Sequence, residues 1–177
     1  MSVEVTYFVH GTTIDNETNK CTGWVGGELS ELGIKQSKEL INQIDGKWFD
    51  VIIASDLKRA VDSARLTWID REILQDSRLR ECNLGKKTLA DESAVIYEEH
   101  IDIPFEDGEC MKDVEKRISD LVKYLKENYD GKKVALVAHR APQLAFEVIA
   151  NNKNWEQALE EDWRKKKAWK PGWVYVV

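Results

Sequence analysis

Short runs of hydrophobic residues alternate along the chain with longer stretches in which hydrophobic residues recur at helical spacing. The runs are rich in β-branched and aromatic residues and predict strands at 3–9, 51–54, 134–138 and 173–177. The helical spacing predicts helices at 29–44, 57–68, 111–125, 142–149 and 155–163. Residues 84–109 show no clean period, and we expect loop and short helix there.

Polar residues and proline mark the expected starts of several helices. Ser30 is available as an N-cap for the first long helix. Ser55 and Asp56 directly follow a strand and offer N-cap chemistry for the next helix. Pro142 suits the first residue of the helix after the 134–138 strand, because a first-turn residue needs no backbone N–H.

Strands separated by helices predict an α/β fold with three layers, a mostly parallel central sheet with helices on both faces. The chain has 177 residues, a length that fits one domain, 1–177, better than two. In open sheets of this kind, ligands bind beyond the carboxyl ends of the strands. The residues just after each strand are therefore the ones to examine.

Histidine and arginine side chains gather at these strand ends. His10 and His139 follow the first and third predicted strands, and they are two of only three histidines in the chain. Arg59 lies in the first turn of the helix after Ser55, and Arg140 follows His139. Helix N-termini, imidazoles and guanidinium groups favour an anion, so we expect a phosphate or carboxylate to bind here.

Composition excludes several classes of function. There are 26 basic and 32 acidic residues, and the net charge of -6 disfavours binding to nucleic acid or to an anionic membrane. No apolar run approaches bilayer length, and no secretory signal is visible. Three cysteines without paired spacing indicate reduced thiols in a cytoplasmic protein. Neither the cysteines nor His100 shows metal-ligand spacing, so we expect no metal.

Four motifs together resemble the histidine phosphatase superfamily, which includes cofactor-dependent phosphoglycerate mutases and many small phosphatases. The motifs are Tyr7–Thr13, Ser55–Ala60, Leu79–Glu81 and Val137–His139, and they occur in the family order over residues 3 to about 150. Asn16, Thr22–Trp24 and Gly108–Glu109 are supporting matches.

The resemblance implies a phosphoglycerate mutase-like fold and a role for each matched residue. His10 would be the nucleophile that carries a phosphohistidine, and Glu81 would be the acid and base. Arg59 and His139 would bind the non-bridging phosphate oxygens. Gly11, Asn16, Thr22 and Gly23 would complete the binding site. The scheme needs neither a metal nor another cofactor.

Two positions depart from the family pattern. Val9 stands where the family has an arginine before the catalytic histidine, and Arg140 stands where many members have glycine. One interpretation is that Arg140 supplies the missing charge and binds substrate. The other is that Arg140 is solvated and the site is impaired.

We therefore expect a cytoplasmic, metal-independent phosphohydrolase that acts on a small phosphorylated metabolite. The segment between Glu81 and the next long helix is short, which favours a phosphatase over a mutase. The alternatives are a mutase-type phosphoryl transferase and a weakened or inactive member that binds a phosphorylated ligand.

The C-terminal segment lies outside the resemblance. Trp155 and Trp163, with Leu159 between them, have the spacing of a helix that packs on the core. The basic run Arg164–Lys167 is expected to be a solvated helix end, and contact with a polyanion or partner is the alternative.

Overall fold

The structure is a computed structural model that describes residues 2–44 and 47–177. Its central sheet has five strands in the order β4-β3-β6-β1-β7. Their bounds are Leu74–Gln75 for β4, Val51–Ala54 for β3, Lys133–Ala138 for β6, Glu4–Val9 for β1 and Trp173–Val176 for β7. Only β7, which pairs with β1, is antiparallel to its neighbour. The prediction of a mostly parallel sheet is confirmed.

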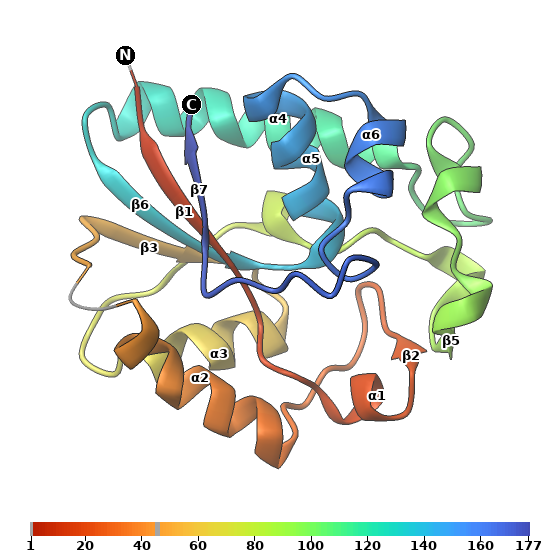
Figure 1. Ribbon diagram of the computed structural model, residues 1–177, viewed down its shortest axis with the longest axis horizontal. Helices are drawn as coiled ribbons and strands as arrows, with labels where there is room; N and C mark the ends of the chain where they lie inside the picture. Colours follow the sequence, from red (N-terminus) through yellow and green to blue (C-terminus); the bar gives the residue numbers. More distant parts are fainter. Residues whose placement is uncertain (1, 45–46) are drawn as a thin grey trace.

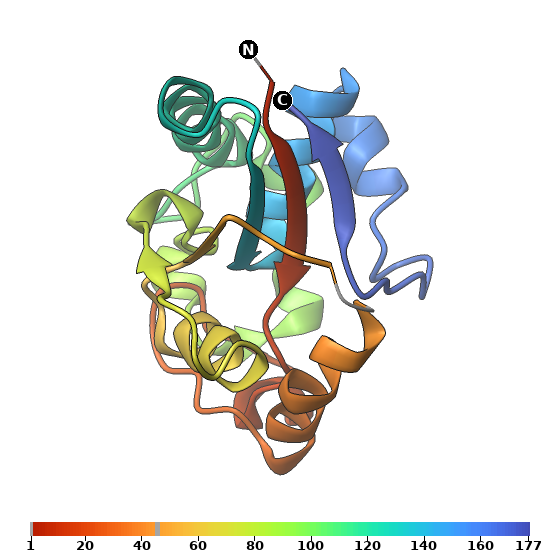
Figure 2. The same cartoon turned by 90° about the vertical axis from the view of Figure 1, so that its left-hand side faces the viewer.

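Helices cover both faces of this sheet, which confirms the predicted three layers (Figure 1). On one face lie α2 (Glu31–Gln43) and α3 (Lys58–Thr67). On the other lie α4 (Met111–Asn128), α5 (Arg140–Asn151) and the short α6 (Trp155–Glu160). Strands β6, β1 and β7 lie side by side in Figure 2, and the two chain termini meet at the same end of the sheet.

The alternation of side chains along each strand divides the core into two parts. Tyr7 and Phe8 are successive buried residues of β1, but they pack into different hydrophobic clusters. Leu136 joins Tyr7 on the side of α4 and α5, whereas Val137 joins Phe8 on the side of α2 and α3. Because both faces are covered, these strands are apolar throughout rather than alternately polar.

The long helices form largely as their sequences predict. In α4 the whole predicted stripe is buried: Met111, Val114, Ile118, Leu121, Val122 and Leu125. Ser30 caps α2, and its Oγ accepts a hydrogen bond from the N–H of Gly33 at 3.2 Å. The hydrophobic spacing over 29–44 predicts that Leu32, Ile41 and Ile44 share one buried face. This is partly wrong, because Leu32 and Ile41 are exposed while Ile44 is buried.

Two predicted helix starts are displaced, that of α3 by one residue and that of α5 by two. Helix α3 begins at Lys58, and Ser55 Oγ instead accepts a hydrogen bond from the N–H of Leu57 at 3.3 Å. Helix α5 begins at Arg140, so Pro142 is its third residue rather than its first. Proline is still tolerated there, since first-turn N–H groups have no partner within the helix.

Several small elements have no clear signal in the sequence. They are α1 (Ile14–Glu17), β2 (Lys20–Cys21), β5 (Ala90–Asp91), η1 (Ser77–Leu79), η2 (Gly85–Lys87), η3 (Glu92–Ala94) and η4 (Tyr97–His100). β2 and β5 form a separate antiparallel pair. The prediction of loop and short helix for residues 84–109 is confirmed except at β5, where a short strand was not expected.

The C-terminal segment differs from its prediction. Trp155 and Leu159 are buried as expected, but α6 ends at Glu160 and residues 161–172 form a non-helical connection to β7. The basic run is therefore not a helix end. Arg164 pairs with Glu92 at 2.8 Å, and Lys165 pairs with Glu98. These ion pairs tie the segment to η3 and η4.

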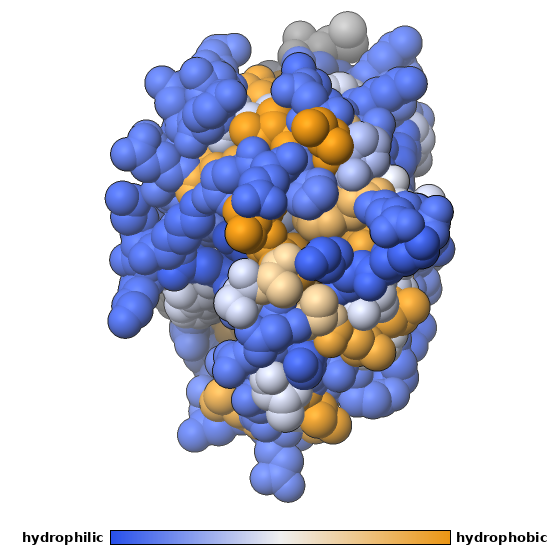
Figure 3. Space-filling view, turned by 90° about the vertical axis from the view of Figure 1, so that its right-hand side faces the viewer, coloured by the Kyte–Doolittle hydropathy of each residue, from blue (hydrophilic) through white to orange (hydrophobic). Residues whose placement is uncertain are grey.

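The side of the molecule that carries α6 is mostly hydrophilic, with small hydrophobic areas between polar side chains (Figure 3). Within residues 2–44 and 47–177, no helix combines the length and the apolar character needed to cross a membrane.

Candidate active site

The carboxyl ends of β1, β3 and β6 bring His10, Ser55 and His139 together. The N–H of His10 donates to the carbonyl of Ala138 at 3.0 Å, which continues the β1–β6 ladder beyond the strands. The two imidazole ring centroids are 5.0 Å apart. His10 and His139 are 129 positions apart in the sequence, and the fold brings them together at one edge of the sheet.

The imidazole of His10 is fixed and uncharged. Its Nδ1 donates to the carbonyl of Gly11 at 2.7 Å, so the unprotonated nitrogen is Nε2. Burial and the positive charge of Arg59 lower the pKa of His10 to about 3. At neutral pH, Nε2 therefore offers a lone pair for nucleophilic attack.

His139 lies deeper in the same site and is fully buried. Its Nε2 is 2.9 Å from the hydroxyl oxygen of Ser55, while its Nδ1 has no hydrogen-bond partner among the described residues. Burial, followed by the charge of Arg59 and the proximity of His10, holds the pKa of His139 well below its usual value. Tyr7 anchors the backbone at this point, because its hydroxyl donates to the His139 carbonyl at 2.7 Å.

Arg59 is a buried cation at the start of α3, with only 2% of its surface exposed. Its Nη2 donates to the carbonyl of Gly23 at 2.7 Å, but its Nη1 is buried without a partner among the described residues. Gly27, with φ of +100°, packs against it: a Cβ there would lie 2.7 Å from Arg59 Cδ. An unpartnered buried guanidinium nitrogen is costly unless an anion binds it.

The carboxylate of Glu81 also lies in the site. Its oxygens accept hydrogen bonds from the N–H groups of Cys82, Arg140 and Ala141 at 2.9, 3.1 and 3.0 Å. Two of these donors belong to the N-terminus of α5, where the helix dipole favours a negative charge. The carboxylate is thereby held at a fixed position beside the pocket.

Arg140 lies in the site, but most of its guanidinium is already engaged. Its Nε donates to Asp162 Oδ2 at 2.7 Å, and its Nη2 lies 2.5 Å from the same oxygen. The guanidinium also lies over the Tyr97 ring, 4.8 Å from the centroid. Arg140 is therefore not solvated, and that part of the prediction is wrong: Arg140 is a largely buried, paired cation at the pocket wall.

The four smaller candidates have distinct positions around the pocket. The Gly11 N–H donates to Ser63 Oγ at 2.9 Å, and Gly11 packs so closely on α2 that a Cβ would lie 2.5 Å from the Gly33 carbonyl. Asn16 forms a capping box with Thr13 at the start of α1. Thr22 and Gly23 line the pocket, and Gly23 supplies the carbonyl that holds Arg59.

All nine candidates lie at or next to one cavity. The cavity has a volume of about 470 Å³, within the range of small-molecule sites. Eight of the candidates line it: His10, Gly11, Asn16, Thr22, Gly23, Arg59, Glu81 and Arg140. The ninth, His139, is not among the lining residues, and its ring centroid lies 5.0 Å from that of His10.

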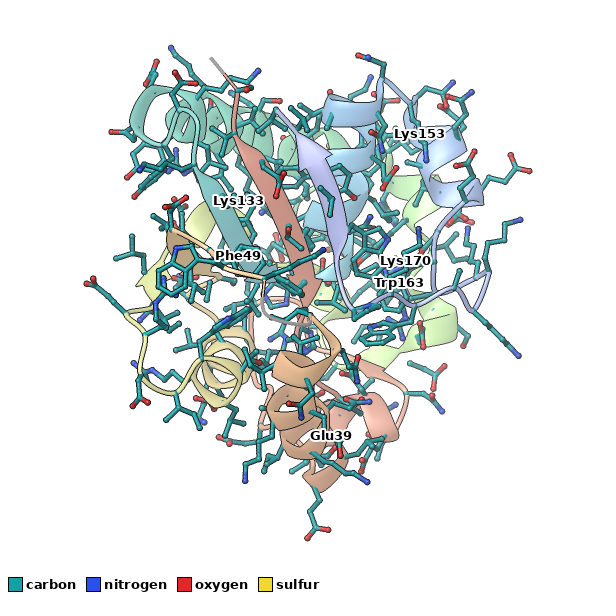
Figure 4. The ribbon with its side chains drawn as sticks, turned by 60° about the vertical axis from the view of Figure 1, so that its left-hand side comes forward. Glu39, Phe49, Lys133, Lys153, Trp163 and Lys170 are labelled. Atoms are coloured by element: carbon teal, nitrogen blue, oxygen red, sulfur yellow. The ribbon has the colours of Figure 1, made fainter. Side chains whose placement is uncertain are left out.

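Several lining residues were not anticipated from the sequence. Trp163, Arg164 and Trp169 line the cavity from the segment before β7, and Gln36, Glu39 and Leu40 line it from α2. Figure 4 shows Trp163 on this segment and Glu39 on α2. In the sequence, only Trp169, which does not fit the helical spacing of Trp155 and Trp163, could have indicated that this segment reaches the site.

No group of three or more His, Cys, Asp or Glu side chains is placed to hold a metal ion within the described part of the chain. The positive charge of the site comes from arginine side chains and helix N-termini.

The chain belongs to the histidine phosphatase superfamily (branch 1), whose family model matches residues 7–158. It is 26% identical over 151 residues to phosphoserine phosphatase 1 of Hydrogenobacter thermophilus, covering 77% of this chain and 71% of that protein. It is 36% identical over 59 residues to a 2,3-bisphosphoglycerate-dependent phosphoglycerate mutase of Pseudoalteromonas atlantica, covering 33% of this chain but only 26% of the mutase.

The fold is shared with solved structures of phosphatases. One is phosphoserine phosphatase from Entamoeba histolytica in complex with 3-phosphoglyceric acid, with a TM-score of 0.79 and 22% identity, covering 89% of this chain and 84% of that one. The relatives thus include both phosphatases and mutases.

Proposed function

We propose that this protein is a phosphohydrolase that acts on a small phosphomonoester through a phosphohistidine on His10. The observation that carries the proposal is a neutral His10 beside two buried nitrogens, Arg59 Nη1 and His139 Nδ1, that have no partner among residues 2–44 and 47–177. A phosphoryl group bound in front of His10 would give both nitrogens a partner. Membership of a superfamily with phosphatase relatives supports the same assignment.

In the first step, His10 Nε2 attacks phosphorus and forms a P–N bond while the bond to the leaving oxygen breaks. Arg59 and His139 would bind the non-bridging oxygens and stabilise their charge through the transition state. If the Ser55 hydroxyl donates to His139 Nε2, the ring proton of His139 lies on Nδ1, where an oxygen can accept it.

Glu81 would enter this step protonated, pass its proton to the leaving oxygen and become the carboxylate. In the second step it would take a proton from water, which attacks phosphorus, breaks the P–N bond and releases inorganic phosphate. Its position beside the pocket, held by three N–H donors, supports this role. The same residue serves as acid and then as base.

We propose hydrolysis without a metal, because the site already holds cationic and N–H donors for the phosphoryl oxygens. Hydrolysis is preferred to mutase chemistry because residues 82–110, which precede α4, form only short 3-10 helices, one short strand and loops. A mutase needs a pocket closed to water, and extra elements often build one.

A second candidate is a member that binds phosphate esters without turning them over. Val9 lines the cavity at the position where the resemblance implies an arginine, so the site has one fewer cation than that pattern. Arg140 also lines the cavity but could contribute only the part of its guanidinium that Asp162 leaves free.

One experiment separates these candidates: a panel of phosphomonoesters assayed for released inorganic phosphate, with and without excess chelator. We expect phosphate release that chelator leaves unchanged and that His10→Ala reduces by about 1,000-fold or more, since the nucleophile is lost. His100→Ala, which changes a histidine outside the pocket, is the matched control and should retain activity.

Three results would contradict the proposal. They are isomerised ester without free phosphate, activity that requires a divalent ion, and binding of inorganic phosphate with no turnover of any ester. The first supports a mutase, the second a metal-dependent enzyme, and the third a binding protein.

A further inference from the structure

Two walls of the cavity are built from residues outside the candidate catalytic set, and they differ in chemistry. One wall is the face of α2 that carries Gln36, Leu40 and Gln43, which share a side of the helix because of their spacing. The other is the segment before β7, which contributes Trp163 and Trp169. The leaving group of a bound phosphomonoester would lie between these walls.

Among the described lining residues, every arginine other than Arg59 already has an anionic partner. The described lining includes three arginines, of which Arg59 faces the phosphoryl position. Arg140 is paired with Asp162, and Arg164 is paired with Glu92 at 2.8 Å. Glu39, which lines the cavity from α2, is paired with Lys35 at 3.9 Å and offers no attraction to an anion. Apart from Arg59, a carboxylate on the leaving group would thus meet only arginines that already have anionic partners.

The two indoles, by contrast, lack contacts that a ring could supply. Trp169 is 51% exposed at the cavity rim, although indole is among the most favourable groups to bury. Trp163 packs against Trp173, with ring centroids 5.6 Å apart, and its buried Nε1 has no hydrogen-bond partner in the part of the chain that the structure describes. A ring that packs on Trp169 would cover its exposed face.

We infer that the natural leaving group is an uncharged ring, which packs on Trp169 between α2 and the segment before β7. This inference rests on the proposed function, because it assigns the substrate class of the same site. An aromatic ring and a sugar ring are both neutral and both have an apolar face, so either could pack on Trp169.

The first test compares esters whose leaving groups are all alkoxides, so that intrinsic reactivity differs little. They are benzyl phosphate, glucose 6-phosphate, ethyl phosphate and phosphoserine. We expect kcat/KM for the better of the two ring esters to exceed that for ethyl phosphate and for phosphoserine by about tenfold, the upper range for one aromatic contact. The benzyl and glucose arms distinguish an aromatic ring from a sugar ring.

The second test uses Trp169→Ala, with Trp48→Ala as the matched control. Trp48 is also exposed, at 66%, but it contacts Arg71 and does not line the cavity. Trp169→Ala should raise KM for the preferred ring ester about three- to tenfold, and leave ethyl phosphate within about twofold. Trp48→Ala should change neither.

Binding of non-hydrolysable phosphonates separates failure of this inference from failure of the proposed function. Benzylphosphonate should bind to the wild-type protein more tightly than methylphosphonate or phosphonoacetate, and Trp169→Ala should remove the difference. If this holds but no ester is hydrolysed, the proposed function fails and the ring site stands. Preference for phosphoserine and phosphonoacetate, or an equal effect of Trp169→Ala on all compounds, would overturn the ring site.

Discussion

At the scale of single residues, the site depends on imidazoles that stay uncharged. Burial and the positive charge of Arg59 both lower the pKa of His10 and of His139, so each effect disfavours the protonated imidazole. These two effects keep the imidazoles neutral for catalysis, and they also make the stability of the fold depend on pH. A histidine that resists protonation only when folded makes the folded state sensitive to acid.

We therefore predict that stability falls as the pH is lowered from about 6.5. The unfolded chain binds a proton on His10 near its ordinary pKa of 6.5, whereas the folded protein binds it only near 3. The contribution is fully present above pH 6.5 and is lost progressively as the pH falls toward 3. The measurement is the Tm by calorimetry at neutral pH and near pH 5.

Other groups also titrate in this range, so the comparison of variants isolates the histidine. His10→Gln should show a smaller loss of Tm on acidification than the wild type, and His100→Gln should show the same loss as the wild type. A wild-type Tm that rises on acidification, or a slope that His10→Gln leaves unchanged, would argue against a neutral His10.

At the scale of elements, a buried ion pair connects the start of α5 to the C-terminal segment. Asp162 is 1% exposed and binds Arg140, whose backbone N–H in turn holds Glu81. Asp162 also accepts a hydrogen bond from the N–H of Arg164 at 2.9 Å. The position of Trp163 and Arg164 at the pocket is therefore linked to the position of Glu81.

Arg140→Ala should accordingly lower the free energy of unfolding by about 3–5 kcal/mol, because it leaves the Asp162 carboxylate buried without its cation. Denaturant unfolding would measure this. The double variant Arg140→Ala/Asp162→Asn should recover part of the loss, since the unpaired charge is removed. Arg65→Ala, which removes an exposed arginine on α3, is the control. A loss below about 1 kcal/mol for Arg140→Ala would contradict this role.

The elements that the sequence predicts well are those with a strong local signal. Strand β6 is a continuous apolar run, and α4 has a complete buried stripe, so both have the expected position. Because strand ends in a parallel sheet share one edge, His10 and His139 could be placed together before their contact was known. The displaced starts of α3 and α5 show that cap residues alone do not fix a boundary.

At the scale of the whole molecule, the features that escape prediction are contacts between segments far apart in sequence. The pair of Arg140 with Asp162 and the pairs of Arg164 and Lys165 with Glu92 and Glu98 have no local pattern. To a reader of the sequence alone, who does not know these pairs, the basic run resembles a solvated helix end and Arg140 resembles a free cation. Their formation places the segment before β7 over the pocket, where it lines the cavity.

The central claim, a phosphoryl group carried by His10, is tested most directly by trapping the intermediate. The protein would be mixed briefly with a radiolabelled phosphomonoester that it hydrolyses, quenched at alkaline pH, digested and analysed by peptide mass spectrometry. We predict acid-labile phosphate on the peptide that contains His10, present in the His100→Ala control and absent from His10→Ala. Sustained turnover by His10→Ala, or label on another residue, would contradict the account.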